Sequence, residues 1–450
     1  ETHTLSTVKQ IYSDRCWLNG KLQPATVCIE GSVISTVITE KLADAIDVGN
    51  KILMPGVIDV HVHINEPGRT EWEGFETATK AAAAGGTTTI IDMPLNASPV
   101  TTTIDAFEQK LDSAKDKLHV NVGFYAGLIP GNTNELPALI EAGVLGVKCF
   151  LVHSGIDEFP NVTKQDMDEA MPVIRKYQVP LLAHCEIYNE EVRNDFENNT
   201  TSYQHYLGSR PKQWENDAVE LMISLCRKHN CATHIVHVAS CEALDPIRKA
   251  KKEGLPLTAE TCSHYICFNA EDIPDHNCVY KCAPPIREKA NNEKLKQALL
   301  DGTLDFITTD HSPAPPAIKE IESGNLKKAW GGIAGLQFLL TSSWTAMKDI
   351  ASIEKIIPLL TEHPAAFIKV NNRKGFIKAG YDADLVVWDP EAEETIFAED
   401  VWHRHKLSPY IGMKLSGKIE RTYVNGELVY ADKQFVDTGK KHGKIILRDQ

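Results

Sequence analysis

The sequence predicts an α/β protein: a closed (β/α)8 barrel with a small β-sandwich domain formed from both chain ends. Three observations support this prediction. Apolar runs alternate with charged stretches of helical length through the middle of the chain, metal-ligating residue types follow several of these runs, and short strands dominate both ends. The polar residues therefore fall where a β/α barrel gathers the ends of its strands.

Eight apolar runs between about residues 54 and 310 have the length of buried strands. They span residues 55–63, 87–93, 119–126, 144–151, 179–184, 232–238, 255–260 and 304–310. Stretches between them carry charges at helical spacing and predict helices over 72–84, 104–117, 165–177, 213–230, 241–253 and 290–301. This alternation is typical of a parallel sheet, and eight units favour closure into a barrel.

The two chain ends differ from the middle. Residues 7–52 and 380–434 contain short alternating strands, with Asn-Gly turns at 19–20 and 425–426 that are typical of hairpins. We expect the ends to meet in one β-sandwich domain, formed by residues 1–52 and 376–450, with the barrel inserted as residues 53–375.

Composition argues against several classes of function, although a locally basic site remains possible. The net charge of −14, from 47 basic and 61 acidic residues, opposes general electrostatic binding to nucleic acid or anionic lipid. No apolar run is long enough to span a bilayer, and neither GxxxxGK[ST] nor GxGxxG is present. Eleven cysteines without a CxxC pair, and a charged stretch where a signal peptide would be apolar, favour reduced thiols and a cytoplasmic location.

Two histidines end the first predicted barrel strand, Val57-Ile58-Asp59-Val60-His61-Val62-His63. Because side chains on a strand alternate, Asp59, His61 and His63 are expected to share one face. The apolar residues of the strand are expected to face the other way, beneath helices; these are Ile58, Val60 and Val62. Two imidazoles on one face can hold a Zn²⁺ ion, and two polar strand residues without a metal are the alternative.

Four further candidate ligands lie at later strands: Lys148, His184, His237 and Asp310. Lys148 stands in an almost wholly apolar strand, where an amine must find a counter-charge or lose its proton. A neutral lysine can take up CO₂, and the resulting carbamate can bridge two metal ions. The alternatives are a lysine paired with a carboxylate, hydrogen-bonded core histidines and a turn aspartate.

Together these donors suffice for two divalent ions, which lower the pKa of a water molecule enough to make it a nucleophile at neutral pH. The set predicts hydrolysis of an unactivated bond, with Asp310 both as a ligand and as the proton carrier. Strand parity turns His234 and His311 away from the set, and we interpret His234 as structural. No role is predicted for His153.

The motifs at residues 59–63, 147–150, 183–186, 237–240 and 309–313 resemble, in order, the metal motifs of the cyclic amidohydrolases. This resemblance covers nearly the whole chain. It implies a TIM barrel with a flanking β-sandwich, two Zn²⁺ ions bridged by a carboxylated Lys148, and opening of a cyclic amide, ureide or imide ring. It also implies a homotetramer.

Within that family, residues 63–75, 92–96 and 329–337 resemble the allantoinase branch, which opens the hydantoin ring of allantoin to give allantoate in purine degradation. This resemblance implies substrate contacts from Asn65, Asn96 and Ala283. Dihydroorotase-like sequences have arginine at the place of Asn65, where it pairs with a substrate carboxylate, whereas asparagine suits a neutral ring. Ala283 stands where relatives often have serine or asparagine; a backbone contact would tolerate alanine, whereas a side-chain contact would weaken the substrate assignment.

Two alternatives remain open. One is a hydantoinase or dihydropyrimidinase that acts on simpler rings, and the other is a metal-free structural relative of dihydropyrimidinase. The presence of every proposed ligand argues against the second.

Overall fold

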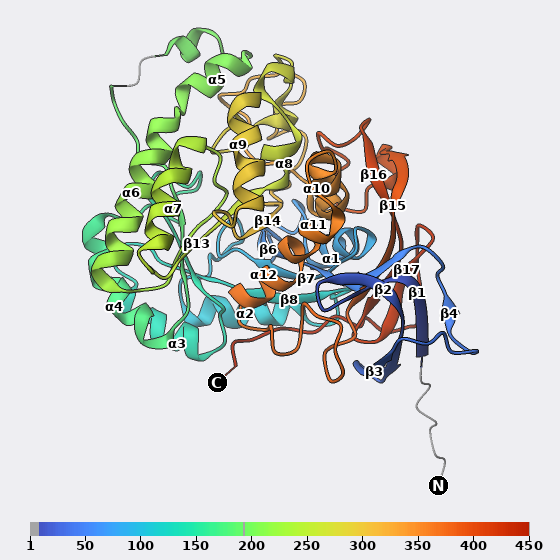
Figure 1. Cartoon of the computed structure of the whole chain (residues 1–450). Coiled ribbons are helices and arrows are strands. Elements are labelled where there is room, and N and C mark those ends of the chain that lie inside the picture. The colour runs from blue at the N-terminus through green and yellow to red at the C-terminus, as the bar shows by residue number, and fades with distance from the viewer. Residues whose placement is uncertain (1–8, 192–193, 450) are drawn as a thin grey trace.

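The computed structural model of the 450-residue chain describes residues 9–191 and 194–449. The first eight residues of the predicted 1–52 segment therefore lie outside the described residues, as does residue 450. Figure 1 shows two parts: a barrel with its helices, and a sheet in which blue strands from the start of the chain lie beside red strands from its end.

Within the described residues, the barrel contains eight parallel strands, each of which begins and ends within three residues of a predicted run. They are β6 (Val57–Val62), β7 (Thr87–Asp92), β8 (Asn121–Phe124) continued by β9 (Ala126–Gly127), β10 (Val147–Phe150), β11 (Leu181–His184), β12 (Thr233–Ile235), β13 (Leu257–Cys262) and β14 (Phe306–Thr308). Tyr125 alone separates β8 from β9. The barrel closes beside β6, where the His63 N–H donates to the His311 carbonyl over 2.8 Å.

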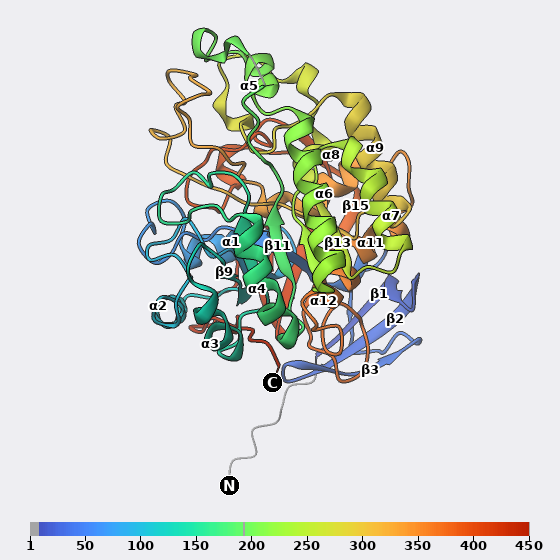
Figure 2. The same cartoon turned by 90° about the vertical axis from the view of Figure 1, so that its left-hand side faces the viewer.

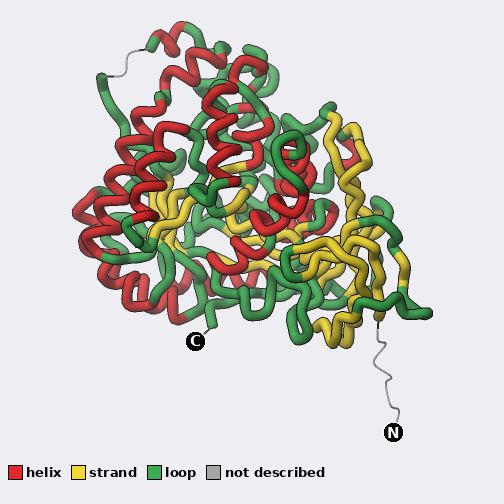
Figure 3. Tube along the Cα trace, viewed as in Figure 1, coloured by secondary structure: helices red, strands yellow, loops and turns green. Residues whose placement is uncertain are grey.

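Helices cover the outside of the barrel strands (Figure 3), and in Figure 2 α4 and α6 flank β11. The six predicted helices are confirmed as α1 (Phe75–Ala84), α2 (Ile104–Ala114), α4 (Lys164–Tyr177), α6 (Lys212–His229), α7 (Leu244–Lys252) and α9 (Lys289–Leu300). Further helices are α3 (Leu136–Glu141), α5 (Tyr203–Ser209), α8 (Ser263–Cys267), α10 (Leu339–Met347), α11 (Ile353–Leu360) and α12 (Glu362–Phe367).

Strands from both chain ends form one nine-stranded sheet, as expected for a shared β-domain. They are β1 (Lys9–Leu18), β2 (Lys21–Glu30), β3 (Val33–Ile38), β4 (Ile46–Asp47), β5 (Ile52–Pro55), β15 (Leu385–Thr395), β16 (Lys414–Val424), β17 (Glu427–Ala431) and β18 (Gln434–Phe435). The order is β18-β17-β16-β15-β5-β1-β2-β3, with β4 beside β1. The antiparallel pair of β5 with β15 joins the two ends.

Alternation along β15 holds this sheet against the barrel. Leu385 and Val387 pack in a cluster within the β-domain, whereas Val386 and Trp388 belong to the cluster that lies between barrel strands and helices. One face of the strand therefore serves each part of the molecule. Past β18, the chain returns to the barrel, where the Ile446 N–H donates to the Val122 carbonyl over 2.8 Å.

One expectation about β6 is wrong. Ile58 and Val60 pack in the cluster that contains Leu182 of β11 and Phe306 of β14, so they face the barrel interior rather than the helices. Val62 does pack beneath the helices, as expected. Register shifts against β7 on both sides of Ile58 and Asp59 break the simple alternation of the strand.

In residues 9–191 and 194–449, no helix is both long enough and apolar enough to cross a membrane. All eleven cysteines lie in this described part of the chain and carry unpaired thiols.

Candidate functional site

All six predicted metal ligands line one cavity of about 1090 Å³ at the carboxyl ends of the barrel strands. His61 and Lys148 lie on β6 and β10, and His184 ends β11. His63, His237 and Asp310 follow the ends of β6, β12 and β14 by one or two residues. Because parallel strands bring their carboxyl ends to one rim, side chains 249 residues apart in the chain meet there.

The first group within the cavity contains His61, His63 and Asp310. Asp310 Oδ1 lies 3.0 Å from His61 Nε2 and 3.1 Å from His63 Nε2. One ligand atom from each residue falls within 4.8 Å of the others. Two imidazole nitrogens and a carboxylate oxygen form a donor set that suits a divalent cation such as Zn²⁺.

The second group is the pair of His184 and His237. His184 Nδ1 lies 2.9 Å from His237 Nε2, while the buried Nδ1 of His237 has no hydrogen-bond partner in the described part of the chain. The rings of His61 and His237 stack with centroids 5.5 Å apart, which places the two groups side by side. The first group fits a divalent cation, and the pair of His184 and His237 lies beside it.

Lys148 is almost fully buried, with 1% of its surface exposed. Its Nζ lies 3.7 Å from Met93 Sδ and 5.0 Å from the centre of the Phe150 ring, and no ion pair of the described residues includes it. The alternative of a lysine paired with a carboxylate is therefore not found. Burial lowers the pKa of Lys148, which favours the neutral amine that carbamate formation requires.

Burial also lowers the pKa of His63 and His184, and together with the charge of His184 it holds the pKa of His237 well below its usual range. Neutral imidazoles are the form that binds metal. His61 differs: burial opposes its protonation, but the charges of Asp310 and Glu260 raise its pKa to about 9. Metal binding at His61 would therefore release a proton near neutral pH.

Two buried glutamates orient the histidine rings, and sequence reasoning missed both. Glu260 Oε2 lies 2.9 Å from His61 Nδ1, so the Nε2 of that ring is left to face Asp310. Glu186 Oε1 lies 2.7 Å from His184 Nε2, which leaves Nδ1 to face His237. The sequence did carry a signal for both. Glu260 ends the predicted barrel strand 255–260, and Glu186 lies two residues beyond the predicted strand 179–184.

The remaining histidines lie as follows. His234 does not line the cavity, and its Nε2 lies 2.8 Å from Glu260 Oε1, in keeping with a structural role. His311 also lies outside the lining, with Nε2 2.6 Å from Glu73 Oε1. His153 lines the cavity, with 60% of its side chain exposed.

Two of the three residues predicted to contact the substrate line the cavity, and the third does not. Asn96 and Ala283 line the cavity, and Asn96 Nδ2 lies 3.4 Å from His63 Nδ1. Asn65 does not line it: its side chain is buried and Nδ2 donates to the Pro313 carbonyl over 3.3 Å. Position 65 does not line this cavity, and its contact with the substrate stays a prediction.

Cationic side chains missed by sequence reasoning do line the cavity. They include Arg69, four residues after Asn65, together with Arg210 and Lys281. The Arg69 guanidinium lies 4.6 Å from the Trp72 ring centre, and its buried Nη1 has no hydrogen-bond partner in the described part of the chain. The cavity thus offers donors to an oxygen-rich ligand although the protein as a whole is acidic.

Backbone strain gathers at this rim. Four non-glycine residues of the site have positive φ: Asn65 (69°), Asn96 (67°), His237 (35°) and Asp310 (46°). Such conformations cost of order 1–3 kcal/mol each and persist only where the surrounding structure holds them. Here they turn the chain sharply where barrel strands end.

Comparison with known proteins agrees with this geometry. The family described as "Amidohydrolase family" matches this chain over residues 52–429. The chain is 40% identical to a protein of Arabidopsis thaliana named allantoinase, over 93% of this chain and 88% of the plant protein. It is 39% identical to the allantoinase of Saccharomyces cerevisiae, over 94% of this chain and 96% of the yeast protein.

Among solved structures, the L-hydantoinase (dihydropyrimidinase) of Arthrobacter aurescens superimposes with a TM-score of 0.91 and 27% identity, over 98% of this chain and 100% of that one. The fold is therefore the TIM barrel with a β-sandwich domain. A family match over most of the chain, and relatives near 40% identity along nearly its whole length, place this protein in the amidohydrolase family.

Proposed function

We propose that this protein hydrolyses the hydantoin ring of allantoin to give allantoate. The observation that carries the proposal is the set of six donors around one cavity, in a chain whose relatives at about 40% identity are named allantoinases. The hydantoin ring is a cyclic amide, and an unactivated amide bond requires the strong nucleophile that such a site can generate.

The family implies a divalent metal site, which His61, His63 and Asp310 fit. We further propose two Zn²⁺ ions, the second held by His184 and His237, with Lys148 as a carboxylated lysine shared between them. Bound there, the ions would lower the pKa of the attacking water and polarise the ring carbonyl.

We propose that Asp310 carries the proton during the reaction. Asp310 stays ionised because, although burial opposes it, the charges and hydrogen bonds of His61 and His63 hold its pKa well below the usual range. Its carboxylate is therefore ready to accept a proton from water as the oxygen adds to the ring carbonyl carbon. The ring C–N bond then breaks and Asp310 passes that proton to the leaving nitrogen, so one water molecule is consumed for each ring opened.

The substrate is proposed to contact Asn96, the backbone of Ala283 and donors on the cavity wall. Asn65 remains a predicted substrate residue, although its amide faces Pro313 in this structure. Among the described residues Arg69 Nη1 has no hydrogen-bond partner, so its N–H is available to donate a hydrogen bond to a ureido oxygen of the substrate.

A hydantoinase or dihydropyrimidinase activity is the second candidate, because structures with those titles share the fold. Turnover on allantoin, hydantoin, dihydrouracil and dihydroorotate, with and without a chelator, separates the candidates. We expect allantoin to have the highest kcat/KM and activity to disappear with the chelator. A clear preference for dihydrouracil or dihydroorotate would refute the substrate, and chelator-resistant turnover would refute the metal site.

The remaining proposals concern the state of the protein. We propose that the protein is a homotetramer. We also propose a cytoplasmic location, because the unpaired thiols favour a reducing compartment. We propose the domains as 53–375 for the barrel and 1–52 with 376–450 for the β-sandwich. Light scattering tests the tetramer, because a monomer or dimer mass would contradict it.

A further inference from the structure

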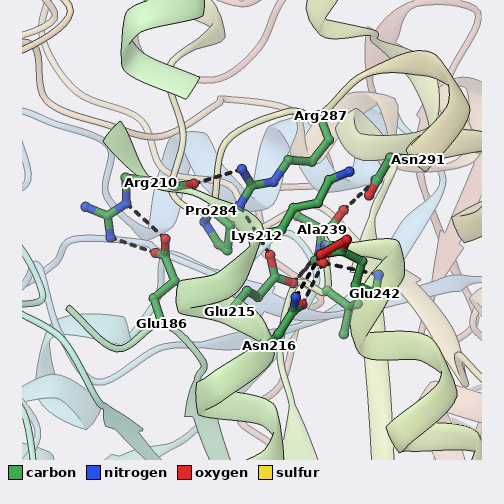
Figure 4. Close-up of polar contacts among 12 residues, drawn as sticks. Glu186, Arg210, Lys212, Glu215, Asn216, Ala239, Glu242, Pro284, Arg287 and Asn291 are labelled. Carbon is green, nitrogen blue, oxygen red and sulfur yellow. Dashed lines mark hydrogen bonds and ion pairs between the residues drawn. The ribbon is translucent and has the colours of Figure 1, made fainter. Parts of the chain in front are cut away.

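A buried ion pair outside the cavity lies between two sets of contacts, one through Arg210 and Glu186 and the other through Ala239 (Figure 4). Its members are Arg287, which lies just before α9, and Glu215 in the first turn of α6. Only 2% of either side chain is exposed. Neither residue lines the cavity, and the mechanism above does not use them.

One set of contacts runs from this pair to His184. Arg287 Nη1 donates to the backbone carbonyl of Arg210 over 2.8 Å. The Arg210 guanidinium in turn donates to both oxygens of Glu186, over 2.6 and 3.1 Å. Since Glu186 holds Nε2 of His184, the position of Arg210 decides where that ring lies.

A second set of contacts runs to His237. Glu215 Oε2 accepts the backbone N–H groups of Ala239 and Ser240 over 2.8 and 2.9 Å. These are the second and third residues after His237, whose φ of 35° requires a firmly held backbone. Glu215 therefore fixes the turn from which His237 points into the cavity.

The two sets of contacts are connected by the charge attraction between Arg287 and Glu215 rather than by a directional hydrogen bond. Arg287 Nη2 lies 3.7 Å from Glu215 Oε1, and neither of these buried atoms has a hydrogen-bond partner among the described residues. Removing one charge of such a pair leaves the other buried and uncompensated. The chain on either side would then shift to relieve it.

We propose that the Arg287–Glu215 pair is a positioning element that sets the separation of His184 and His237, and thereby the affinity of one of the two metal positions. The other position, at His61, His63 and Asp310, relies on Glu260 instead. This inference rests on the proposed two-ion centre. It predicts that the charges of Arg287 and Glu215, which lie outside the cavity, control the affinity of the metal position at His184 and His237 and not that of the other position.

The test is a titration of the metal-free protein with Co²⁺, followed by its visible spectrum and by elemental analysis after dialysis. We expect two equivalents in the unmodified protein. Arg287→Met should weaken one equivalent at least about tenfold and leave the other within about twofold. Arg287→Lys keeps the charge but not the two-pronged reach, so its loss should be smaller.

Arg227→Met is the matched control, because Arg227 lies on α6, as Glu215 does, and pairs with Glu253 over 2.9 Å at the surface. It should bind Co²⁺ like the unmodified protein. In a His184→Ala background, where that metal position is already damaged, Arg287→Met should change the remaining equivalent little.

The outcomes are distinguishable. Equal weakening of both equivalents, no weakening of either, or the same loss in Arg227→Met would overturn the positioning role. Fewer than two equivalents in the unmodified protein would refute the two-ion centre and this inference with it. If circular dichroism shows that Arg287→Met is unfolded, Glu215→Gln takes its place in the Co²⁺ titration. This variant removes the negative charge of the pair, while its amide oxygen can still accept the backbone N–H groups of Ala239 and Ser240.

Discussion

Replacing Lys148 by alanine removes the proposed bridge between the metal ions at a small structural cost. The change deletes three buried methylene groups at about 0.8 kcal/mol each, so the free energy of unfolding of the metal-free protein should fall by about 2 kcal/mol. No ion pair is lost, because no carboxylate of the described residues pairs with the Lys148 amine. The fold should survive.

The expected effect on metal binding is much larger. Loss of a residue that only orients a ligand typically weakens metal binding by about 10–100-fold. Loss of a ligand shared by both ions should exceed that range, and kcat/KM for allantoin should fall at least about 100-fold, equivalent to about 2.7 kcal/mol. Metal content after dialysis and the rate of allantoate formation measure the two effects.

A matched variant sharpens the assay. Lys148→Ala leaves a space beside Met93 and Phe150 that a short carboxylic acid can enter, whereas Lys148→Met fills that space with a chain of similar length. Added acetate or propionate should partly restore activity to the alanine variant only. Full activity and full metal content in Lys148→Ala without added acid, or equal rescue of Lys148→Met, would refute the carbamate.

Three further perturbations test other parts of the site and the fold. Asp310→Asn should lower kcat by about 100-fold or more because an amide cannot carry the proton, and His311→Ala should cost less; equal losses, with full metal content in Asp310→Asn, would mean that the proton carrier is misassigned. Glu260→Gln removes the charge 2.9 Å from His61 Nδ1, so metal affinity should fall about 10–100-fold, and unchanged affinity would contradict the orienting role. Burial lowers the pKa of His403 to about 3, below the usual 6.5, so its unfolded state binds more protons and acid destabilises the fold below about pH 6.5. His403→Phe should weaken this dependence in urea unfolding at about pH 7 and pH 5, and an unchanged difference would count against it.

Local sequence determined the order of the elements and the identity of the metal donors. Apolar runs of strand length and charged stretches of helical spacing depend only on neighbouring residues, so eight barrel strands and six helices were predictable within a few residues. His61 and His63 were predictable for the same reason, since they end such a run. The buried Lys148 was conspicuous because its neighbours in the chain are apolar.

Tertiary structure decided which side chains share the site and how they are held. Register shifts turned Ile58 and Val60 into the barrel, and positive φ turns the chain at His237 and Asp310, just beyond the strand ends. Asn65 and Arg69 lie four residues apart, yet only Arg69 lines the cavity, because a turn separates them. Glu260 orients His61 across 199 residues of chain. Such contacts depend on the closure of the barrel, which brings distant strands together and which no local pattern records.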